Sequence, residues 1–351
     1  MLRRKLLLFL SVIAAVAVIS AIIVYDRFLA DNVEPEGEKA EIFIPEGASY
    51  RQAMDSVISK LRIRNQGILE WFAERKGYPG LVKPGKYVID RPLGYNELVN
   101  ILRGGRQSPV RITFSNVRTI NELAGRIGGK IEADSAAIAG FLSDPDNYSE
   151  DGFSPETIIS VFIPDTYEFY WNTDPKKLYS RMLREYRNFW NDERMQKSSL
   201  LNLTPAEVST LASIVDQEAL KSDEKPRIAG VYINRLRIGM PLQADPTIKF
   251  AVNDFTMNRV LTRHLEVDSP YNTYRNPGLP PGPISCPSIE GIDAVLNAEE
   301  HDYLYFAAKA DFSGYHNFAR TLSEHNRYAN EYRRELNRSE ERRVGKECRS
   351  R

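Results

Sequence analysis

The first hydrophobic pattern in the chain is an apolar run at the N-terminus. Leu6 to Tyr25 contains no charged residue, and basic residues precede it while acidic residues follow it. At about 1.5 Å per helical residue, this run matches a bilayer core of about 30 Å. The charge pattern predicts a single-pass anchor in the cell inner membrane, with residues 1–25 starting in the cytoplasm and the remaining chain in the periplasm. A cleaved signal peptide is the alternative, although its apolar segment is usually only about 7–15 residues long.

Strand and helix patterns alternate after the anchor. Residues 26–40 are acidic and contain Pro35 and Gly37, which predicts a tether. Residues 41–105 show the pattern strand, two helices and strand, which predicts a small α+β module. Residues 106–152 are interpreted as a second small module or a connector, in which Val110 to Phe114 alternates as a strand.

Longer helical patterns fill residues 153–337, which are predicted to form a larger α+β domain. Helices are expected over Pro175–Trp190, Thr204–Lys221, Ile228–Leu236, Ile289–Leu296 and Leu322–Leu336, and a buried strand over Tyr303–Ala308. Ser269 to Pro283 holds too many prolines and glycines for regular structure, and an ordered loop of this length is usually functional. Residues 338–351 have no apolar pattern and are interpreted as a non-native tail.

The helix predicted from Thr204 carries an acidic residue on its apolar face. Thr204 is a suitable cap, and Glu207 stands three residues later, where it closes a capping box. Leu211 and Ile214 then start a stripe with i, i+3 spacing, and Glu218 occupies a later position of the same stripe. A carboxylate on an apolar face is costly unless it is paired, neutral or functional.

Two interpretations of Glu218 follow from its position. It is either a buried structural residue paired with an arginine such as Arg227 or Arg235, or a general acid. Apolar surroundings would raise the pKa of the acid above the reference value of about 4.3, so that a proton is available near neutral pH.

A second carboxylate for Glu218 is not obvious from the sequence. Two-carboxylate glycosidases need a partner about 5–9 Å away. Asp216 is a poor candidate because it lies roughly 160° around the helix from Glu218. Asp245 is a candidate in space, but it precedes Pro246, and this pattern favours a role in capping a helix.

Composition and motifs exclude several functional classes. The chain has 47 basic and 47 acidic residues, so no net field favours nucleic acid. Its two cysteines and four histidines show no metal-ligand spacing, and no phosphate-binding or dinucleotide-binding motif is present, so no metal or cofactor is expected. The remaining candidates are carboxylates in a half of the chain rich in aromatic and loop residues, which favours carbohydrate chemistry. Core packing is favoured over stacking on sugar rings for the aromatic residues Tyr167, Phe169, Tyr170 and Trp171. His316 is favoured as a hydrogen-bonded turn residue over a base.

Several ordered segments together resemble the YceG-like endolytic murein transglycosylase family. They are A-S-I-V-D-Q-E at Ala212–Glu218, I-N-R-L-R-I-G-M-P-L-Q-A-D-P-T at Ile233–Thr247 and S-P-Y-N-T-Y-R-N-P-G-L-P-P-G-P-I at Ser269–Ile284, followed by Y-L-Y-F, H-N-F and T-L-S-E-H-N. The N-terminal anchor and a small module similar to a LysM domain agree with this resemblance, which covers nearly the whole chain. Cys286 and Ser288 stand where the family commonly has Asn and Gly, and Asp216 where many members have Glu.

The resemblance implies cleavage of the β-1,4 bond between N-acetylmuramic acid and N-acetylglucosamine in nascent peptidoglycan strands, leaving 1,6-anhydro ends and limiting strand length. The family's catalytic residue is the last of its A-S-I-x-x-x-E pattern, which is Glu218 here. Gln243, Asp245, Asn272 and Tyr274 are expected to shape the sugar site. Peptidoglycan strands, the membrane through residues 6–25 and peptidoglycan synthases are the expected partners. The alternative is a membrane-tethered glycan-binding or scaffold protein of cell-wall synthesis in which Glu218 is only structural.

Overall fold

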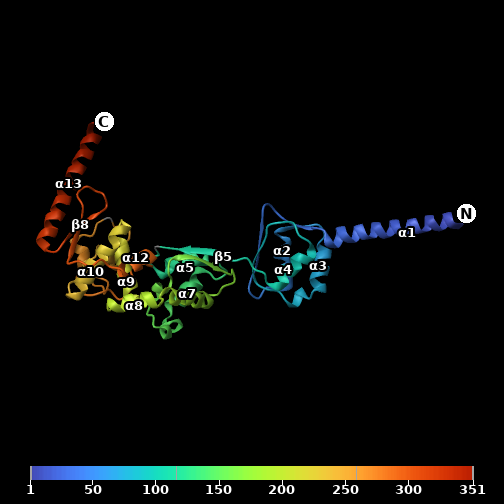
Figure 1. Ribbon diagram of the computed structural model, residues 1–351, viewed down its shortest axis with the longest axis horizontal. Helices are drawn as coiled ribbons and strands as arrows, with labels where there is room; N and C mark the ends of the chain where they lie inside the picture. Colours follow the sequence, from blue (N-terminus) through green and yellow to red (C-terminus); the bar gives the residue numbers. More distant parts are fainter. Residues whose placement is uncertain (1, 116, 258, 350–351) are drawn as a thin grey trace. The chain divides into compact units, whose positions relative to one another are not determined.

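The computed structural model describes residues 2–115, 117–257 and 259–349, which form two compact units. The first unit comprises the chain up to Ile112, together with Gly128–Asp134 and Tyr167–Asp174. The second comprises Thr113–Ile127, Ser135–Thr166 and the chain from Pro175 onward. Both units contain helices and strands (Figure 1), so the predicted α+β class is confirmed.

The N-terminal apolar run forms one continuous helix, α1 (Leu2–Val24). Its segment Leu7–Val24 is long and apolar enough to cross a membrane, and none of it is buried against the rest of the protein. An anchor or a signal sequence explains this exposure, whereas a core helix would be covered.

The segment predicted to be a tether contains regular structure. A π-helical turn (Tyr25–Leu29) follows α1, and β1 (Val33–Pro35) then pairs antiparallel with β3 (Leu61–Ile63). Val33 is fully buried, and its backbone also bonds to Leu93 at 3.0 and 2.9 Å. The tether prediction was wrong here because a single buried valine in an acidic stretch gives no visible periodicity.

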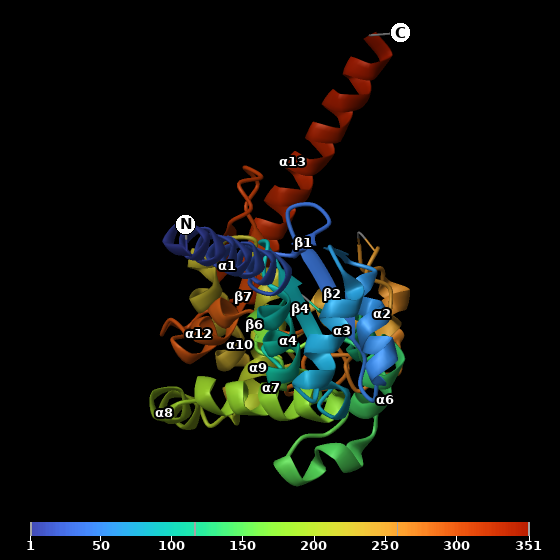
Figure 2. The same ribbon diagram turned by 90° about the vertical axis from the view of Figure 1, so that its right-hand side faces the viewer.

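The small module has a two-stranded sheet covered by helices. Strand β2 (Ala40–Ile44) pairs antiparallel with β4 (Gly85–Ile89), with Ile42 opposite Tyr87. Helices α2 (Tyr50–Ile58), α3 (Gln66–Arg75) and α4 (Tyr95–Gly104) lie beside this sheet (Figure 2) and share one core with it. The predicted order of strand, two helices and strand is confirmed, with β3 as an unpredicted addition between the helices.

The predicted strand β5 (Val110–Phe114) pairs with β6 (Asp165–Phe169), and both strands continue from one unit into the other. The aromatic segment at β6 is only partly core. Tyr167 and Phe169 are buried, whereas Tyr170 is exposed and Trp171 packs edge-on against Phe43.

The second unit is mainly helical. Its remaining elements are α5 (Ile120–Gly128), α6 (Ser135–Ser143), α7 (Pro175–Phe189), α8 (Asp192–Leu200), α9 (Pro205–Glu218), α10 (Lys225–Arg237), α11 (Asp245–Val252), α12 (Ile289–Leu296), the antiparallel hairpin β7 (Tyr305–Ala308) and β8 (His316–Ala319), and α13 (Leu322–Arg349).

Helix α9 is the centre of this unit. It packs against α8, α10, α11 and α12, and every residue from Val208 to Val215 is buried. The sequence predicted a helix with one apolar face, whereas the structure shows a helix whose middle is buried on all sides. Its interior hydroxyls are partly satisfied within the helix, because Thr210 and Ser213 donate to backbone carbonyls at 2.8 and 2.7 Å.

Polar contacts hold both ends of α9. The predicted capping box is present, with the Thr204 hydroxyl accepting from the Glu207 amide and the Glu207 carboxylate accepting from the Thr204 amide. Near the other end, Asp216 accepts from the amide and hydroxyl of Ser288 at 2.6 and 2.8 Å and pairs with Lys225 at 3.0 Å. A Cβ at Gly291 would come within 2.5 Å of this carboxylate, so Asp216 is tightly enclosed between α10 and α12.

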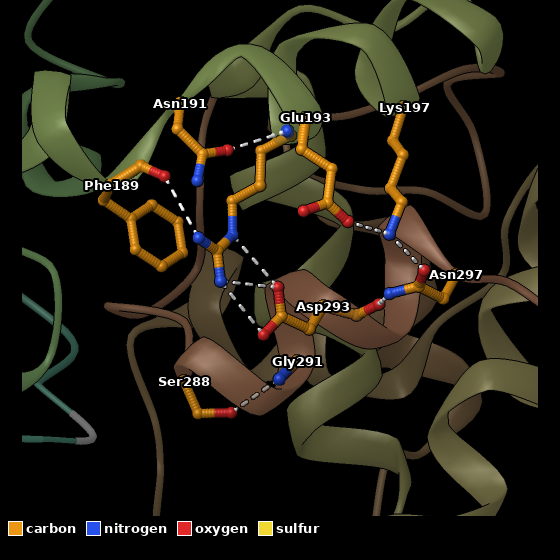
Figure 3. Close-up of polar contacts among 9 residues, drawn as sticks. Phe189, Asn191, Glu193, Lys197, Ser288, Gly291, Asp293 and Asn297 are labelled. Carbon is orange, nitrogen blue, oxygen red and sulfur yellow. Dashed lines mark hydrogen bonds and ion pairs between the residues drawn. The ribbon is translucent and has the colours of Figure 1, made fainter.

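Helix α8, which the sequence did not predict, is joined to α12 by a polar network (Figure 3). Arg194 donates to both carboxylate oxygens of Asp293 at 3.1 and 3.3 Å. Lys197 donates to Asn297 at 2.8 Å, and Asn191 caps the start of α8. These contacts join α12 to α8, and α8 itself contacts α9.

The C-terminal elements differ from their prediction in two ways. The strand begins at Tyr305 rather than Tyr303 and is half-buried rather than buried. Helix α13 continues past the expected end at Leu336 as far as Arg349. The residues interpreted as a non-native tail are thus helical up to Arg349, and their last two residues lie outside the described ranges.

Candidate functional site

The carboxylate of Glu218 lies in a cleft of about 400 Å³ within the second unit. The cleft is formed by the end of α9, one face of α10, the start of α11, the proline-rich loop, the β7 strand and the start of α13. The residues lining it are Glu218, Tyr232, Arg235, Leu242, Gln243, Asp245, Tyr274, Tyr305, Phe306, Leu322 and His325. Glu218 is half-buried, so solvent and a ligand can reach the carboxylate that the sequence places on the apolar face of the helix.

Helix α9 ends at Glu218, three residues before the predicted end. Ala219 is extended, with φ −93° and ψ 115°, and its amide makes the last helical bond, to the carbonyl of Val215. A carboxylate at a helix C-terminus faces the negative end of the helix dipole, which disfavours its ionised form.

Burial and a neighbouring charge raise the pKa of Glu218 from its usual 4.5 to about 7. Loss of hydration is the larger cause, and the negative charge of Asp245 is the second. A hydrogen bond from the Tyr232 hydroxyl to Oε1, at 3.3 Å, and the positive charges of Lys249 and Arg235 act in the opposite direction. The carboxyl group is therefore half-protonated near neutral pH.

The ion-pair interpretation of Glu218 is wrong for both arginines considered. Arg227 pairs instead with Glu299 at 2.9 Å. Arg235 donates to the carbonyls of Leu242 and Leu304, both at 2.6 Å. The guanidinium of Arg235 thus lines the cleft and supplies positive charge without forming an ion pair with Glu218, which leaves the proton of Glu218 free for exchange.

A buried threonine pair positions the loop that enters the cleft. The Thr273 hydroxyl accepts from the Ala244 amide at 3.0 Å and lies 2.8 Å from the Thr247 hydroxyl. The Gln243 amide donates to the Thr273 carbonyl at 3.0 Å, and Gln243 has φ 51°, a conformation uncommon for a residue other than glycine. Backbone conformations of this kind are costly and occur mainly at functional sites, where the surrounding structure maintains them.

Asp245 does not have the capping role that the sequence favoured. The residue at the cap position of α11 is Ala244, and Asp245 is the first residue of the helix, without a capping bond. Its Oδ1 accepts from the Tyr274 hydroxyl at 2.6 Å instead. The prediction was wrong because Tyr274, brought by a distant loop, provides a partner that no local pattern shows.

Of the expected sugar-site residues, Gln243, Asp245 and Tyr274 line the cleft with Glu218, and Asn272 does not. Asn272 is fully buried, and its amide donates to the carbonyls of Leu265 and Val267 at 2.9 and 2.8 Å. Its Oδ1 accepts from the Tyr274 amide at 3.0 Å. Asn272 therefore shapes the loop that presents Tyr274 rather than contacting the cleft.

The sequence did not indicate the aromatic wall of the cleft or His325. Tyr305 and Phe306 come from β7, and the His325 ring lies 5.5 Å from that of Tyr305. Burial and the nearby positive charge of Arg235 lower the pKa of His325, so it is neutral near pH 7. The aromatic wall and His325 both lie in segments that carry the family resemblance, Y-L-Y-F and T-L-S-E-H-N, and this resemblance is the signal that could have indicated them.

Other sequence candidates are engaged elsewhere. His316 bonds to the buried carboxylate of Glu224 at 2.9 Å. The buried thiol of Cys286 donates to the Phe162 carbonyl at 2.6 Å, and burial raises its pKa to about 12, so it is unreactive. Within the described ranges, no group of three His, Cys, Asp or Glu side chains is arranged to hold a metal ion.

Comparisons with known proteins identify relatives along most of the chain. The model of the YceG-like family matches residues 42–331. The chain is 28% identical to the endolytic murein transglycosylase of Bacillus subtilis, over 90% of this chain and 91% of that protein. It is also 28% identical to the endolytic murein transglycosylase of Streptococcus pneumoniae D39, over 76% of this chain and 53% of that longer protein. A crystal structure of a yceG-like protein from Listeria monocytogenes is similar with a TM-score of 0.55 and 27% identity, covering 83% of this chain and 98% of that one.

The raised pKa of Glu218 predicts a stability change on Glu218→Gln. Between the usual pKa of 4.5 and the folded value of about 7, the folded chain keeps a proton that the unfolded chain releases, so wild-type stability falls as pH rises through this window. The glutamine, which resembles the protonated acid, escapes this loss. We expect the variant to be more stable than wild type by up to about 3 kcal/mol at pH 8 and equally stable near pH 4.

Thermal unfolding at both pH values measures this difference. Glu193→Gln is the control, because Glu193 is exposed and its pKa is lowered by Lys197 rather than raised. A stabilisation by Glu218→Gln that is the same at pH 4 and pH 8 would show that Glu218 has an ordinary pKa.

Proposed function

The chain belongs to the YceG-like family, and we propose that it is an endolytic murein transglycosylase with Glu218 as its catalytic acid and base. It cleaves the β-1,4 bond between N-acetylmuramic acid and N-acetylglucosamine in nascent glycan strands, leaves 1,6-anhydro ends and so limits strand length. The relatives named as endolytic murein transglycosylases support this activity. The observation that carries the role of Glu218 is a carboxyl group with a pKa near 7 in an accessible cleft.

One carboxyl group is sufficient for the reaction. The protonated Glu218 donates its proton to the glycosidic oxygen as the bond from that oxygen to C1 of the muramic acid breaks. The resulting Glu218 carboxylate takes the proton from the C6 hydroxyl of the same sugar, and O6 bonds to C1. The proton lost in the first step is regained in the second, and an intramolecular hydroxyl replaces the water of a hydrolase.

The surrounding charges support both steps. Arg235 and Lys249 stabilise Glu218 after it has given up its proton, and the Tyr232 hydroxyl bonds to the same carboxylate. Asp245 adds a negative charge to the cleft, which stabilises the positive charge that develops on the sugar ring. Gln243 and Tyr274 complete the polar lining that orients the sugar.

The alternative of a non-catalytic scaffold lacks a specific observation in its favour. A glycan-binding surface needs hydroxyl-bonding groups and aromatic rings, but it does not need a half-protonated carboxyl group. The raised pKa of Glu218 is unfavourable for an ionised structural residue and useful for an acid catalyst.

The apolar helix α1 supports a location of this activity at the membrane. Residues 6–25, which lie in α1 up to Val24, anchor the protein in the cell inner membrane, and the catalytic unit lies in the periplasm near peptidoglycan synthases. We propose that the small α+β module, which is similar to a LysM domain, either binds glycan or positions the catalytic unit. Washing membranes with high salt is expected to leave the full-length protein in the membrane fraction, because about 20 apolar residues are buried in lipid; release by salt would contradict the anchor.

Digestion of purified peptidoglycan tests the reaction. Wild-type protein should produce fragments with 1,6-anhydro-muramic acid ends, identified by mass spectrometry, and Glu218→Gln should reduce them by at least about a thousandfold, because the group that acts as acid and then as base is lost. Equal yields from both proteins would remove Glu218 from the mechanism. Reducing ends would instead indicate a hydrolase, with Asp245 as the second carboxylate.

The pH dependence of activity provides a second test, because two substitutions are expected to shift the pKa of Glu218 in opposite directions. Activity should fall above about pH 7 as Glu218 loses its proton. Asp245→Asn removes a charge that raises the pKa of Glu218, so the alkaline limb should move to lower pH. Tyr232→Phe removes a hydrogen bond that lowers this pKa, so the limb should move to higher pH. Shifts of the same sign in kcat profiles of the two variants would contradict the electrostatic assignment.

A further inference from the structure

A small positively charged hollow lies against the same two helix ends as the Glu218 cleft. Its volume is about 80 Å³, and it is lined by Arg118, Gln217, Pro246, Lys249, Phe255 and Ile284. Gln217 directly precedes Glu218, and Pro246 directly follows Asp245. Since consecutive Cα atoms are about 3.8 Å apart, the hollow and the cleft are neighbours on either side of the end of α9 and the start of α11.

The two cations of the hollow are not neutralised by an ion pair within the described residues. The Arg118 guanidinium lies over the ring of Phe255, at 4.8 Å from its centroid, which holds the side chain without neutralising its charge. Neither Arg118 nor Lys249 forms an ion pair within the described ranges.

Nearby carboxylates have other partners. Glu122 accepts from the backbone amide of Arg118 at 2.9 Å and pairs with Arg126 at 2.7 Å. Asp254 accepts from the amide and hydroxyl of Thr256 at 3.0 and 2.7 Å. Two unneutralised cations on one small hollow, with the exposed amide of Gln217 beside them, match an anionic ligand.

We propose that this hollow binds a carboxylate of the peptide stem carried by the muramic acid whose bond is cleaved. The proposal rests on the proposed function, which supplies a muramoyl substrate in the adjoining cleft. The stem is attached to that sugar through its lactyl ether, so its carboxylates lie within a few residues of Glu218, at about 3.3 Å per extended residue. Phe255 and Ile284 provide an apolar wall for the aliphatic part of the stem.

A peptide carboxylate fits this location better than the pyrophosphate of a lipid-linked strand. Both are anions that an arginine and a lysine would bind. An endolytic cut, however, occurs within the strand and therefore away from its lipid-linked end, whereas every muramic acid that carries a stem brings carboxylates to the cleft. Lys249 also acts electrostatically on Glu218, which places the hollow within range of the reacting bond.

Binding measured in the full-length Glu218→Gln protein tests the proposal. This background prevents cleavage, and it removes the effect of Lys249 on the Glu218 pKa. The probes are soluble uncross-linked glycan strands with free stem carboxylates and the same strands with these carboxylates converted to methylamides. We expect Arg118→Gln together with Lys249→Gln to weaken binding of the free-carboxylate strands about tenfold, and to leave binding of the methylamide strands unchanged.

The control pair is Lys176→Gln with Arg184→Gln, which removes two exposed positive charges from α7 of the same unit. An equal loss from this pair, or an equal loss with the methylamide strands, would overturn the proposal. So would displacement of the strands by inorganic pyrophosphate but not by free stem peptide, because the hollow would then hold a phosphate group.

Cleavage by the protein that retains Glu218 separates the two proposals. Carboxylate-dependent binding without anhydro products would contradict the transglycosylase function and leave the peptide site in place. Anhydro products without carboxylate-dependent binding would leave the enzyme and remove the peptide site.

Discussion

The structure of the second unit depends on the burial of α9 on every side. Its middle, from Val208 to Val215, has no face in contact with solvent, and four helices pack around it. A helix buried in this way cannot rotate or slide without opening the core, so the position of its last residue is determined by packing. Glu218 is that residue, and the extended backbone at Ala219 leaves its side chain at the wall of the cleft.

The pKa of Glu218 results from opposing effects, of which those that favour the neutral form are larger. Burial and Asp245 favour its neutral form, while Tyr232, Lys249 and Arg235 favour the carboxylate, and the balance lies near pH 7. Arg235 acts only as a charge at a distance, because its guanidinium donates to the carbonyls of Leu242 and Leu304. A direct ion pair would hold Glu218 ionised, whereas a charge at a distance lets the group alternate between acid and base.

Local patterns predicted the elements that depend on neighbouring residues in the chain. The capping box at Thr204, the helices α7, α9, α10 and α12, and the alternating strand β5 are confirmed, because caps and periodic burial are properties of short segments. The predictions were wrong at residues whose burial or hydrogen bonding depends on a partner distant in the sequence. Val33 is buried by β3 and Leu93 in a segment that resembled a tether, and Asp245 bonds to Tyr274 instead of capping α11.

The sequence by itself determined that Glu218 stands on the apolar face of a capped helix, and its motifs carried the family resemblance. These are relations along the chain, and i, i+3 spacing is enough to show them. Only the tertiary structure decided that Glu218 forms no ion pair within the described residues, is accessible and is half-protonated near neutral pH. That outcome depends on Asp245, Arg235 and Lys249, whose distances from Glu218 are set by the packing of α10 and α11 on α9. Desolvation and Coulomb interactions act through space, and the order of residues along the chain does not record those distances.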